Sequence, residues 1–355
     1  MDFELSEEQQ AVSDLAGQIF AGHLDQERFM AVEATEDHFD RDLWAELARA
    51  GLIGISLPSA LGGGDQDFLA SSVLFEQAGR YAAPLPLLPT VITAMALATF
   101  GGDAHAALVK GACAGEVILS FALVESDATI AREDAGVWKL SGSKTCVPAG
   151  PIADRILVPA GGGVYLVDPS SPGVTVTRLA TTSGSAEARI DLADAPGEPI
   201  GGAQIVEWIT ERATSAICSI LAGACKEAVR LTAEYAKTRE QFERPIATFQ
   251  AVAQRAADAY IDAEAVHLTA RQAAWRLSQG LAATEEVAIA KYFAAESGQR
   301  VVHAAQHIHG GVGVDRSYPL HRYFLLAKQL ELTLGGTTAN LLKIGAILAS
   351  EPAAV

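Results

Sequence analysis

The stretch YAKTREQFERPIATFQ, residues 235–250, interrupts two long segments with helical periodicity and places Arg239 and Arg244 around Phe242. Pro245 cannot continue a helix, because it lacks an N–H group and its ring clashes with the preceding turn. Apolar and alanine positions on both sides recur every three or four residues. The stretch therefore predicts a sharp connection between two antiparallel helices of a bundle, with arginine side chains at its tip.

The helical pattern continues from about residue 205 to the C-terminus, and alanine is frequent on its packing faces. The positions that mark successive faces are Ile217, Leu221, Ala224, Ala228, Leu231 and Tyr235, then Phe249, Val252, Ala256, Tyr260, Ala263, Val266, Ala270 and Ala274, then Val287, Ala290, Ala294, Val301 and Ala305, then Leu320, Phe324, Ala327 and Leu330, then Leu341, Ile344 and Leu348. Long amphipathic helices with short breaks predict an antiparallel four-helix bundle as the C-terminal domain, residues 204–355.

The rest of the chain divides into a helical part and a strand-rich part. In residues 1–118, Ser6 and Gln9 form a capping-box pattern, and Gly51 ends a second helical segment. Residues 119–203 change to six short β-branched runs separated by turn residues. These patterns predict an N-terminal α-helical domain followed by a compact middle domain, an antiparallel β-barrel or sandwich without βαβ units.

The composition excludes several classes of partner. The chain of 355 residues has 26 Lys and Arg against 43 Asp and Glu, a formal charge of −17, so its field repels nucleic acid and anionic membrane surfaces. It has no signal-peptide pattern, and its longest apolar run, residues 90–100, is shorter than the roughly 20 residues that span a bilayer. We therefore expect a cytoplasmic protein without nucleic-acid or membrane partners, in which local arginines would hold any anionic ligand.

Cysteine and histidine spacing does not favour a disulfide framework or a metal site. The four cysteines form no C-x-x-C pair. His303 and His307 stand four residues apart, a spacing that could hold a metal, but no Glu lies between them as in a zinc-binding protease helix. Polar residues near the end of a helix are the better explanation.

A second polar break, QHIHGGVGVDRSYPLHRYF at residues 306–324, follows the third long helical segment. Gly310, Gly311 and Gly313 would let backbone N–H groups approach a ligand closely, as in loops that hold phosphate. A turn before a helix that begins near Pro319 accounts for the same glycines. From these residues alone, both interpretations stay open.

Taken together and in this order, the motifs resemble those of the acyl-CoA dehydrogenases. The similar passages are FELSEEQ, LWAELARAGLIGISLPSALGGG, LSGSKTCVPAG, YAKTREQFERPIATFQ and QHIHGGVGV, and they extend over nearly the whole chain. The R-x-Q-F passage with its following P-I and F-Q is the most specific of them. The resemblance implies the acyl-CoA dehydrogenase fold, with an N-terminal helical domain, a middle β-barrel and a C-terminal bundle.

The resemblance also implies FAD, bound at a subunit boundary. In that family, one chain's R-x-Q-F and Q-x-x-G-G-x-G segments hold the pyrophosphate and adenosine of a neighbour's FAD. Carried over, the cofactor-binding residues are Arg239, Gln241, Phe242, Gln306, Gly310 and Gly311. Arg239 would pair with the pyrophosphate, because a guanidinium fork and bare backbone amides suit a dianion.

Departures from the family pattern fall on the part of the site that would hold the flavin ring. The passage FALVESDATIARED keeps Glu125 but lacks the family's G-S-D, so the flavin loop is shortened. In LSGSKTCVPAG, Cys146 replaces an aromatic residue and Pro148 a hydroxyl residue that meet the ring. Glu243 also stands where R-x-Q-F-G has glycine, and a carboxylate beside a pyrophosphate is unfavourable unless Arg244 neutralises it.

The family's catalytic glutamate has no counterpart at its usual place. The Y-E-G-T-like turn reads L-G-G-T here, with Gly335 at the glutamate position. Other branches carry the base on the first bundle helix, where Glu211-Arg212 resembles their E-R pair. Glu211 comes about two residues too early, which is about 200° around a helix, so a bulge would be needed to make it the base.

Loss of the base with retention of the ADP-side motifs indicates a division of labour between two chains. The small subunits of actinobacterial α2β2 acyl-CoA dehydrogenases, which act on steroid side-chain CoA thioesters, are similar in these respects. The resemblance implies a helper subunit that binds the ADP half of FAD while a larger dehydrogenase subunit supplies the glutamate. The complex would oxidise an acyl-CoA to the trans-2-enoyl-CoA.

Two other hypotheses remain beside this one. The chain could be a self-sufficient homotetrameric acyl-CoA dehydrogenase that uses Glu211 or another carboxylate as its base. It could also be a flavin-free structural or acyl-binding homologue that kept the fold. Flavin content of the purified chain, alone and with a larger partner, separates the three.

Overall fold

The computed structural model describes residues 3–350, and the chain divides into two compact units. The helical unit consists of the residues up to Phe29, Ser71–Ala83 and the residues from Thr214 onwards. The mixed unit consists of Met30–Ala70 and Pro84–Ala213. The predicted order of helical, strand-rich and helical stretches is confirmed. Domain boundaries at residues 118 and 203 stay a prediction.

The short helices of the mixed unit are fixed by a cap and by buried contacts. They are α3 (Arg41–Arg49), η1 (Ser59–Leu61), α5 (Leu87–Phe100), η2 (Asp103–His105), α6 (Ala106–Cys113) and η3 (Gly150–Ile152). Asp40 accepts a hydrogen bond from the Leu43 N–H at the start of α3. Trp44 on that helix donates its indole N–H to the Gly115 carbonyl, 2.9 Å away. The apolar helix α5 is buried along most of its length, as a helix without a polar face requires.

Seven strands form the sheet of the mixed unit, in the order β1–β4–β5–β7–β3–β2 with β6 paired to β7. The strands are β1 (Leu119–Phe121), β2 (Val124–Asp134), β3 (Val137–Pro148), β4 (Arg155–Ala160), β5 (Gly163–Val167), β6 (Val174–Leu179) and β7 (Glu187–Gly202). Their inward side chains, among them Leu140, Ile156, Val158 and Ile190, form one buried core. The alternation of buried and exposed positions along β7 follows from the two-residue period of a strand.

The sheet differs from a purely antiparallel one at its first strand. The apolar run at residues 117–124 does not form a single strand, because the chain leaves the ladder at Ala122 and Leu123 and makes two strands, β1 and β2. The first of these pairs in parallel with β4, whereas the other pairs of the sheet are antiparallel. A parallel pair needs a long crossover, and the hairpin of β2 and β3 supplies it.

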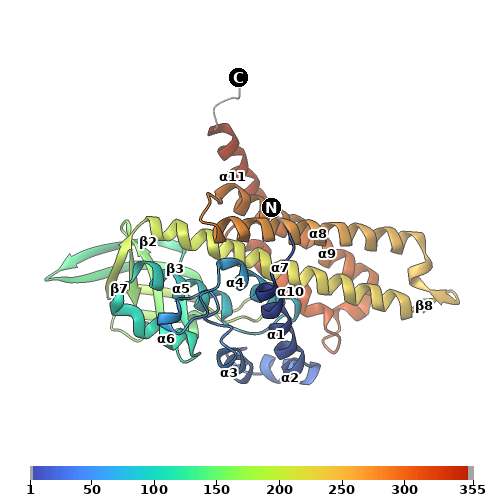
Figure 1. Ribbon diagram of the computed structural model, residues 1–355, viewed down its shortest axis with the longest axis horizontal. Helices are drawn as coiled ribbons and strands as arrows, with labels where there is room; N and C mark the ends of the chain where they lie inside the picture. The colour runs from blue at the N-terminus through green and yellow to red at the C-terminus, as the bar shows by residue number, and fades with distance from the viewer. Residues whose placement is uncertain (1–2, 351–355) are drawn as a thin grey trace. The chain divides into compact units, whose positions relative to one another are not determined.

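Long helices dominate the helical unit (Figure 1). They are α1 (Glu7–His23), α4 (Phe68–Arg80), α7 (Gln204–Thr238), α8 (Gln250–Ser278), α9 (Thr284–His309), α10 (Leu320–Leu332) and α11 (Thr337–Ser350), and α2 (Gln26–Glu33), α4 and α7 each continue into the mixed unit. The predicted capping box of α1 is confirmed, since Ser6 and Gln9 exchange side-chain and backbone hydrogen bonds. The predicted core positions Ile217, Leu221 and Ala224 on α7 are buried.

Helices α4 and α7 touch through their backbones. A Cβ atom on Gly79 would lie 1.9 Å from the Ile220 carbonyl oxygen, and one on Gly223 would lie 1.8 Å from the Glu76 carbonyl oxygen. Neither position can hold a side chain unless the helices separate, because backbone atoms cannot yield as a flexible side chain does. The two glycines therefore fix how the polar residues of α4 and α7 face each other.

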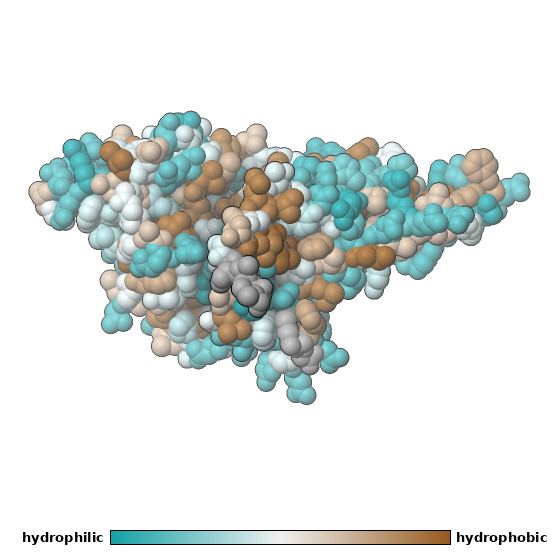
Figure 2. Space-filling model, turned by 90° about the horizontal axis from the view of Figure 1, so that it is seen from above, coloured by the Kyte–Doolittle hydropathy of each residue, from teal (hydrophilic) through white to brown (hydrophobic). Residues whose placement is uncertain are grey.

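The C-terminal helix α11 is apolar and largely exposed, whereas α10 before it is mostly buried or half-buried. Residues 320–350 are, among the described residues, the segment long and apolar enough to cross a membrane, with 6% of the most apolar window buried. The structure breaks this segment at residues 333–336 into α10 and α11, of 13 and 14 residues. Leu341, Leu342 and Leu348 are exposed on α11, and we call these three residues the α11 face. In Figure 2, hydrophobic side chains gather at the centre of the view.

Candidate functional site

The connection between α7 and α8 is a small hairpin, which we call the strap (residues 239–249). Strands β8 (Glu240–Gln241) and β9 (Arg244–Pro245) pair in antiparallel fashion, and η4 (Ile246–Thr248) leads into α8. The two residues at the tip, Phe242 and Glu243, both have positive φ, 55° and 63°. Two-residue hairpin turns of this kind favour Gly or Asn, so these side chains adopt a backbone conformation that costs free energy.

The strap displays its polar side chains to solvent. Arg239, Gln241 and Phe242 are exposed, and Phe242 retains 87% of its accessible surface. The guanidinium of Arg239 has no hydrogen bond or ion pair with any described residue, although its backbone N–H bonds to the Tyr235 carbonyl. An uncommitted guanidinium beside an exposed aromatic ring is suited to bind an anion that carries a flat group.

Arg244 does not form the ion pair with Glu243 that would offset the charge of this carboxylate. Its guanidinium carbon lies 4.2 Å from the centre of the Phe249 ring, and Phe249 also meets Phe242 edge-on. Within residues 3–350, no ion pair joins Arg244 to Glu243. Glu243 therefore has no cationic partner among the described residues, and its carboxylate would oppose the binding of an anion at Arg239.

The second predicted segment is the glycine loop, residues 310–314, which forms a short 3₁₀ turn after α9. Gly310 and Gly311 are exposed, and a Cβ atom built on either would meet nothing within 4 Å. Gly310 has φ +60°, a conformation that glycine adopts without strain. Open space beside two bare backbone positions is what a loop that lies against a ligand needs.

Gln306 shapes this loop from within. Its amide nitrogen donates to the Gly310 carbonyl at 2.9 Å, and a Cβ atom on Gly313 would lie 2.7 Å from its amide oxygen. Three residues separate Gln306 from Gly310, whereas the Q-x-x-G-G-x-G motif has two, so the residue at the motif's spacing is the exposed His307. The role proposed for Gln306 in lining the adenosine end stays a prediction, and His307 is the alternative.

His309 lies directly before the glycine loop and contacts the end of α7 that leads into the strap, and the sequence analysis did not single it out. Its ring stacks on Tyr235 with centroids 4.4 Å apart, one helical turn before Arg239. Nδ1 lies 2.8 Å from the Ala305 carbonyl and must donate to it, so Nε2, 3.1 Å from the Tyr318 hydroxyl, accepts. Burial lowers the pKa of His309, which favours this neutral form. The ring is therefore held in one tautomer between both predicted binding segments.

The turn at the family's glutamate position is closed by side chains on both sides. Leu334 and Gly335 have φ 56° and 98°. The buried Asn340 donates its amide to the Gly335 and Gly336 carbonyls, both at 3.0 Å. The fully buried Lys291 donates to the Leu330 and Glu331 carbonyls at the end of α10, and burial lowers its pKa to about 8.

This geometry leaves no proton acceptor at Gly335. A Cβ atom there would fit, at 3.4 Å from Ala339 and Asn340, but a φ of +98° is one that side chains rarely adopt. A glutamate at this position would therefore require the turn to change shape.

Glu211, the other candidate base, lies in the part of α7 that belongs to the mixed unit. The helix is continuous α-helix from Gln204 to Thr238, so the bulge that would shift Glu211 by two residues is not formed. Its neighbour Arg212 stacks over the Trp208 ring at 3.8 Å, and burial lowers the pKa of that guanidinium to about 10. Glu211 stays a predicted base with a register that does not favour it.

The strand residues expected near a flavin ring are engaged in the mixed unit's own structure. Lys144 is buried, and its ammonium group lies 2.5 Å from Glu125, which lowers the pKa of that carboxyl. Pro148 has no N–H group, and its carbonyl accepts a hydrogen bond from Ser120. Cys146 is exposed with φ 51°.

Comparison with known proteins identifies the class. The acyl-CoA dehydrogenase N-terminal domain matches residues 6–116, and the acyl-CoA dehydrogenase C-terminal domain matches residues 201–348. The chain therefore belongs to the acyl-CoA dehydrogenase family, and both the predicted family and the predicted fold are confirmed.

Three similar proteins show which members of the family this chain resembles. The chain is 39% identical to acyl-CoA dehydrogenase FadE27 of Mycobacterium tuberculosis, over 99% of this chain and 100% of the relative. One chain of the ChsE4-ChsE5 complex from the same organism superposes with a TM-score of 0.97 at 39% identity, over 99% of this chain and 100% of that chain. A variant of the Tcur3481-Tcur3483 steroid acyl-CoA dehydrogenase gives 0.93 at 39% identity, over 97% and 98%. The chain is thus similar to subunits of heteromeric assemblies.

Proposed function

We propose that this chain is the helper subunit of a heteromeric acyl-CoA dehydrogenase, in which it binds the ADP half of FAD. The observation that carries the proposal is a contrast inside the helical unit. The Arg239 guanidinium is exposed without a partner among the described residues, and Gly310 and Gly311 are exposed with open space beside them, while the turn that carries the family's base holds Gly335. Glycine has no group that accepts a proton, so in this proposal a second chain supplies the glutamate.

Arg239 and the glycine loop would contribute affinity and geometry. The guanidinium of Arg239 would donate to pyrophosphate oxygens, Phe242 would pack beside them, and the backbone at Gly310 would lie against the adenosine end. Gln241 and either Gln306 or His307 would add polar contacts around this group. FAD, when bound, accepts the hydride that leaves the β-carbon of an acyl-CoA.

The partner's role follows from the balance of the reaction. Removal of one hydride from the β-carbon and one proton from the α-carbon gives a trans-2-enoyl-CoA, and the proton needs a carboxylate near the α-carbon. The helical unit supplies none at Gly335. We therefore assign the proton transfer to a glutamate of a larger dehydrogenase subunit in an α2β2 assembly.

The α11 face supports assembly with another chain. Leu342 keeps 70% of its accessible surface, and Leu341 and Leu348 keep 54% each. Helix α11 has one lysine and no acidic residue, in a chain with a net charge of −17. A neutral apolar surface of this kind is typical of a subunit interface.

The proposed substrate is a steroid side-chain CoA thioester. The support is the similarity to a chain of the Tcur3481-Tcur3483 steroid acyl-CoA dehydrogenase, at 39% identity over 97% of this chain. Turnover of such a thioester by the reconstituted complex, compared with a straight-chain acyl-CoA of similar length, tests this assignment.

The decisive experiment measures FAD stoichiometry by absorbance on the chain purified alone and on the chain co-expressed with a larger acyl-CoA dehydrogenase subunit. We expect flavin only in the complex, and its loss with Arg239→Ala in this chain. Exposed Arg255 on α8 offers a matched control, Arg255→Ala, which should leave flavin content unchanged.

Other outcomes identify the other hypotheses. A lone chain that binds FAD and oxidises acyl-CoA is a self-sufficient dehydrogenase, and Glu211→Gln should then abolish its turnover. A complex that binds as much FAD with Arg239→Ala as without it overturns the helper role. A folded chain without flavin in any assembly would be a flavin-free homologue.

A further inference from the structure

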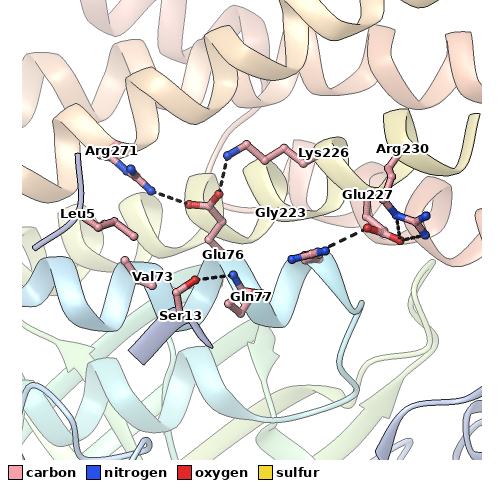
Figure 3. Close-up of a pocket in the computed structure, with 11 residues that line it drawn as sticks. Leu5, Ser13, Val73, Glu76, Gln77, Gly223, Lys226, Glu227, Arg230 and Arg271 are labelled. Atoms are coloured by element: carbon pink, nitrogen blue, oxygen red, sulfur yellow. Dashed lines mark hydrogen bonds and ion pairs between the residues drawn. The ribbon is translucent and has the colours of Figure 1, made fainter. Parts of the chain in front are cut away.

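A charged cavity lies inside the helical unit, between α1, α4, α7 and α8 (Figure 3). Its volume is about 300 Å³. The residues with charged groups on its wall are Glu76, Arg80, Lys226, Glu227, Arg230 and Arg271. The α4 and α7 backbones are in contact at Gly79 and Gly223, and this contact brings the polar side chains of the two helices close together. The cavity shares no residue with the strap or the glycine loop.

The cavity's first carboxylate, Glu76, is fully engaged. Its oxygens lie 3.0 Å from the Lys226 ammonium, 3.4 Å from the Arg271 guanidinium and 3.1 Å from His267 Nδ1. Burial opposes ionisation of Glu76, but the hydrogen bond with His267 and the neighbouring charges lower its pKa to about 2. Glu76 is therefore a carboxylate near neutral pH and has little capacity to accept another cation.

The second carboxylate, Glu227, is engaged in the same way. One of its oxygens accepts hydrogen bonds from two nitrogens of Arg230, at 2.9 and 2.5 Å. Its other oxygen lies 3.6 Å from Arg80, beyond hydrogen-bond distance. The four cationic groups around the cavity thus face two carboxylates, and both carboxylates are already used.

Three of the cationic groups still have N–H donors to offer. Lys226 makes one ion pair, and Arg230 uses two nitrogens on Glu227. The Arg80 guanidinium lies 3.6 Å from Glu227 and over the Tyr81 ring, 5.6 Å from its centroid, so its N–H groups remain available. The side chains of Arg80 and Arg230 keep 46% and 52% of their accessible surface, so a solute can reach them. Arginine forks offer pairs of donors that match the oxygens of a phosphate.

A further polar group on the cavity wall has an unused acceptor. The Gln77 amide nitrogen donates to the Ser13 hydroxyl at 2.8 Å, while its buried oxygen has no hydrogen-bond partner among the described residues. A buried amide without a partner is costly, and a ligand hydroxyl or an ordered solvent molecule would relieve that cost.

We propose that this cavity is a binding site for a small dianion of the phosphate class, held by Arg80, Arg230 and Lys226. Two positive charges in excess inside a chain of net charge −17 make the cavity a local minimum for such an ion. The volume accommodates a phosphate with a short organic stem. The two carboxylates keep the arginine and lysine heads apart and in place, so that the ion meets a preformed set of donors.

The test is titration calorimetry of the full-length chain, in the assembly in which it purifies, at constant ionic strength. The probes are sulfate, inorganic phosphate and a short phosphate monoester, with chloride as the reference salt. Arg80→Gln is the principal variant, because Glu227 keeps Arg230 as its partner when Arg80 is removed. Arg230→Gln is the second variant, and Arg255→Gln on the exposed side of α8 is the control.

We expect saturable binding of one dianion per chain, weakened about tenfold or more by Arg80→Gln and unchanged by Arg255→Gln, as loss of a charged hydrogen bond predicts. Phosphate binding should strengthen from about pH 6 to about pH 8 as phosphate gains its second charge, while sulfate binding should change little. No saturable binding, or an equal loss with Arg255→Gln, overturns the site. Tighter binding of the monoester identifies a phosphorylated metabolite as its occupant, and equal binding identifies the free anion.

Discussion

The strap and the turn at Gly335 are both connections between helices of the same unit, and they are built in opposite ways. At the strap, a guanidinium, an amide and a phenyl ring extend into solvent and the backbone adopts a strained turn. At the Gly335 turn, Lys291 and Asn340 take up four backbone carbonyls, and no ionisable side chain is presented. One connection leaves its polar and aromatic side chains exposed, and the other uses buried side chains to keep its own shape.

The difference between the two connections shows how the fold is kept although Gly335 stands at the position of the family's glutamate. A turn that held only a missing glutamate would be open and weakly determined. Here the turn is fixed by buried donors, so it serves the stability of the α10–α11 junction regardless of chemistry. The strap has the reverse balance, because its exposed groups add little to stability. The proposed function assigns these groups to FAD binding.

The largest expected effect comes from breaking the closed turn with Lys291→Ala. The substitution leaves two buried carbonyls without a donor and a cavity where the stem was, so we expect stability to fall by about 3 kcal/mol or more. Chemical denaturation measures it. Lys291→Met fills the space without the donor, and should recover part of the loss. A change within error for both variants would show that the turn is not held in this way.

Gly335→Glu tests whether the turn can take back a base. A side chain at φ +98° should cost roughly 1–2 kcal/mol of stability, and the chain alone should still fail to oxidise acyl-CoA. Gly335→Ala carries the same backbone cost without the carboxylate and is the control. Acyl-CoA oxidation by Gly335→Glu at an unchanged melting temperature would contradict the closed description of this turn.

His309→Phe tests the link between the strap and the glycine loop. Phenylalanine keeps the stack on Tyr235 but loses the bonds to Ala305 and Tyr318, so FAD affinity of the complex should fall about tenfold. Because burial lowers the His309 pKa, the stability that it contributes is present above about pH 6.5 and is lost as the pH falls through the lowered value. The variant should lack this acid limb in a pH-stability profile. Tyr318→Phe removes one bond and should have a smaller effect.

Glu243→Gly should have the smallest effect, and it should raise both the stability and the FAD affinity of the strap. Glycine removes the strain at φ 63° and a carboxylate near the proposed pyrophosphate, so we expect about 1 kcal/mol of added stability and a few-fold gain in FAD affinity. Glu240→Gln removes a neighbouring charge without touching the turn. If both variants gain equally in affinity, charge and not backbone conformation limits binding at the strap.

Much of this fold could be predicted because its signals are local. The capping box at Ser6, the buried face through Ile217 and Leu221, and the helix break at the strap each depend on residues within a few turns. The parallel pair of β1 and β4 could not be predicted, because it depends on a break at Ala122 and Leu123 that the apolar sequence does not mark.

In the candidate site too, features that depend on neighbouring residues could be predicted, and features that depend on distant residues could not. The motif around Arg239 is contiguous, and its exposure agrees with the prediction that it faces a ligand. The role of His309 depends on Tyr235, which is distant in sequence, and the role of Lys291 depends on carbonyls of α10. Residues that act by bracing a backbone carry no motif, and only the folded structure reveals them.

The strained tip of the strap should also affect how often this turn opens. Phe242 and Glu243 hold a left-handed pair in a hairpin whose strands are only two residues long each, so this turn should open far more often than the helices on either side. Its amide protons should therefore exchange with solvent quickly while Phe242 is bare, and slowly once another chain covers that ring. The amide exchange rate of the strap would therefore show whether the proposed partner chain is bound.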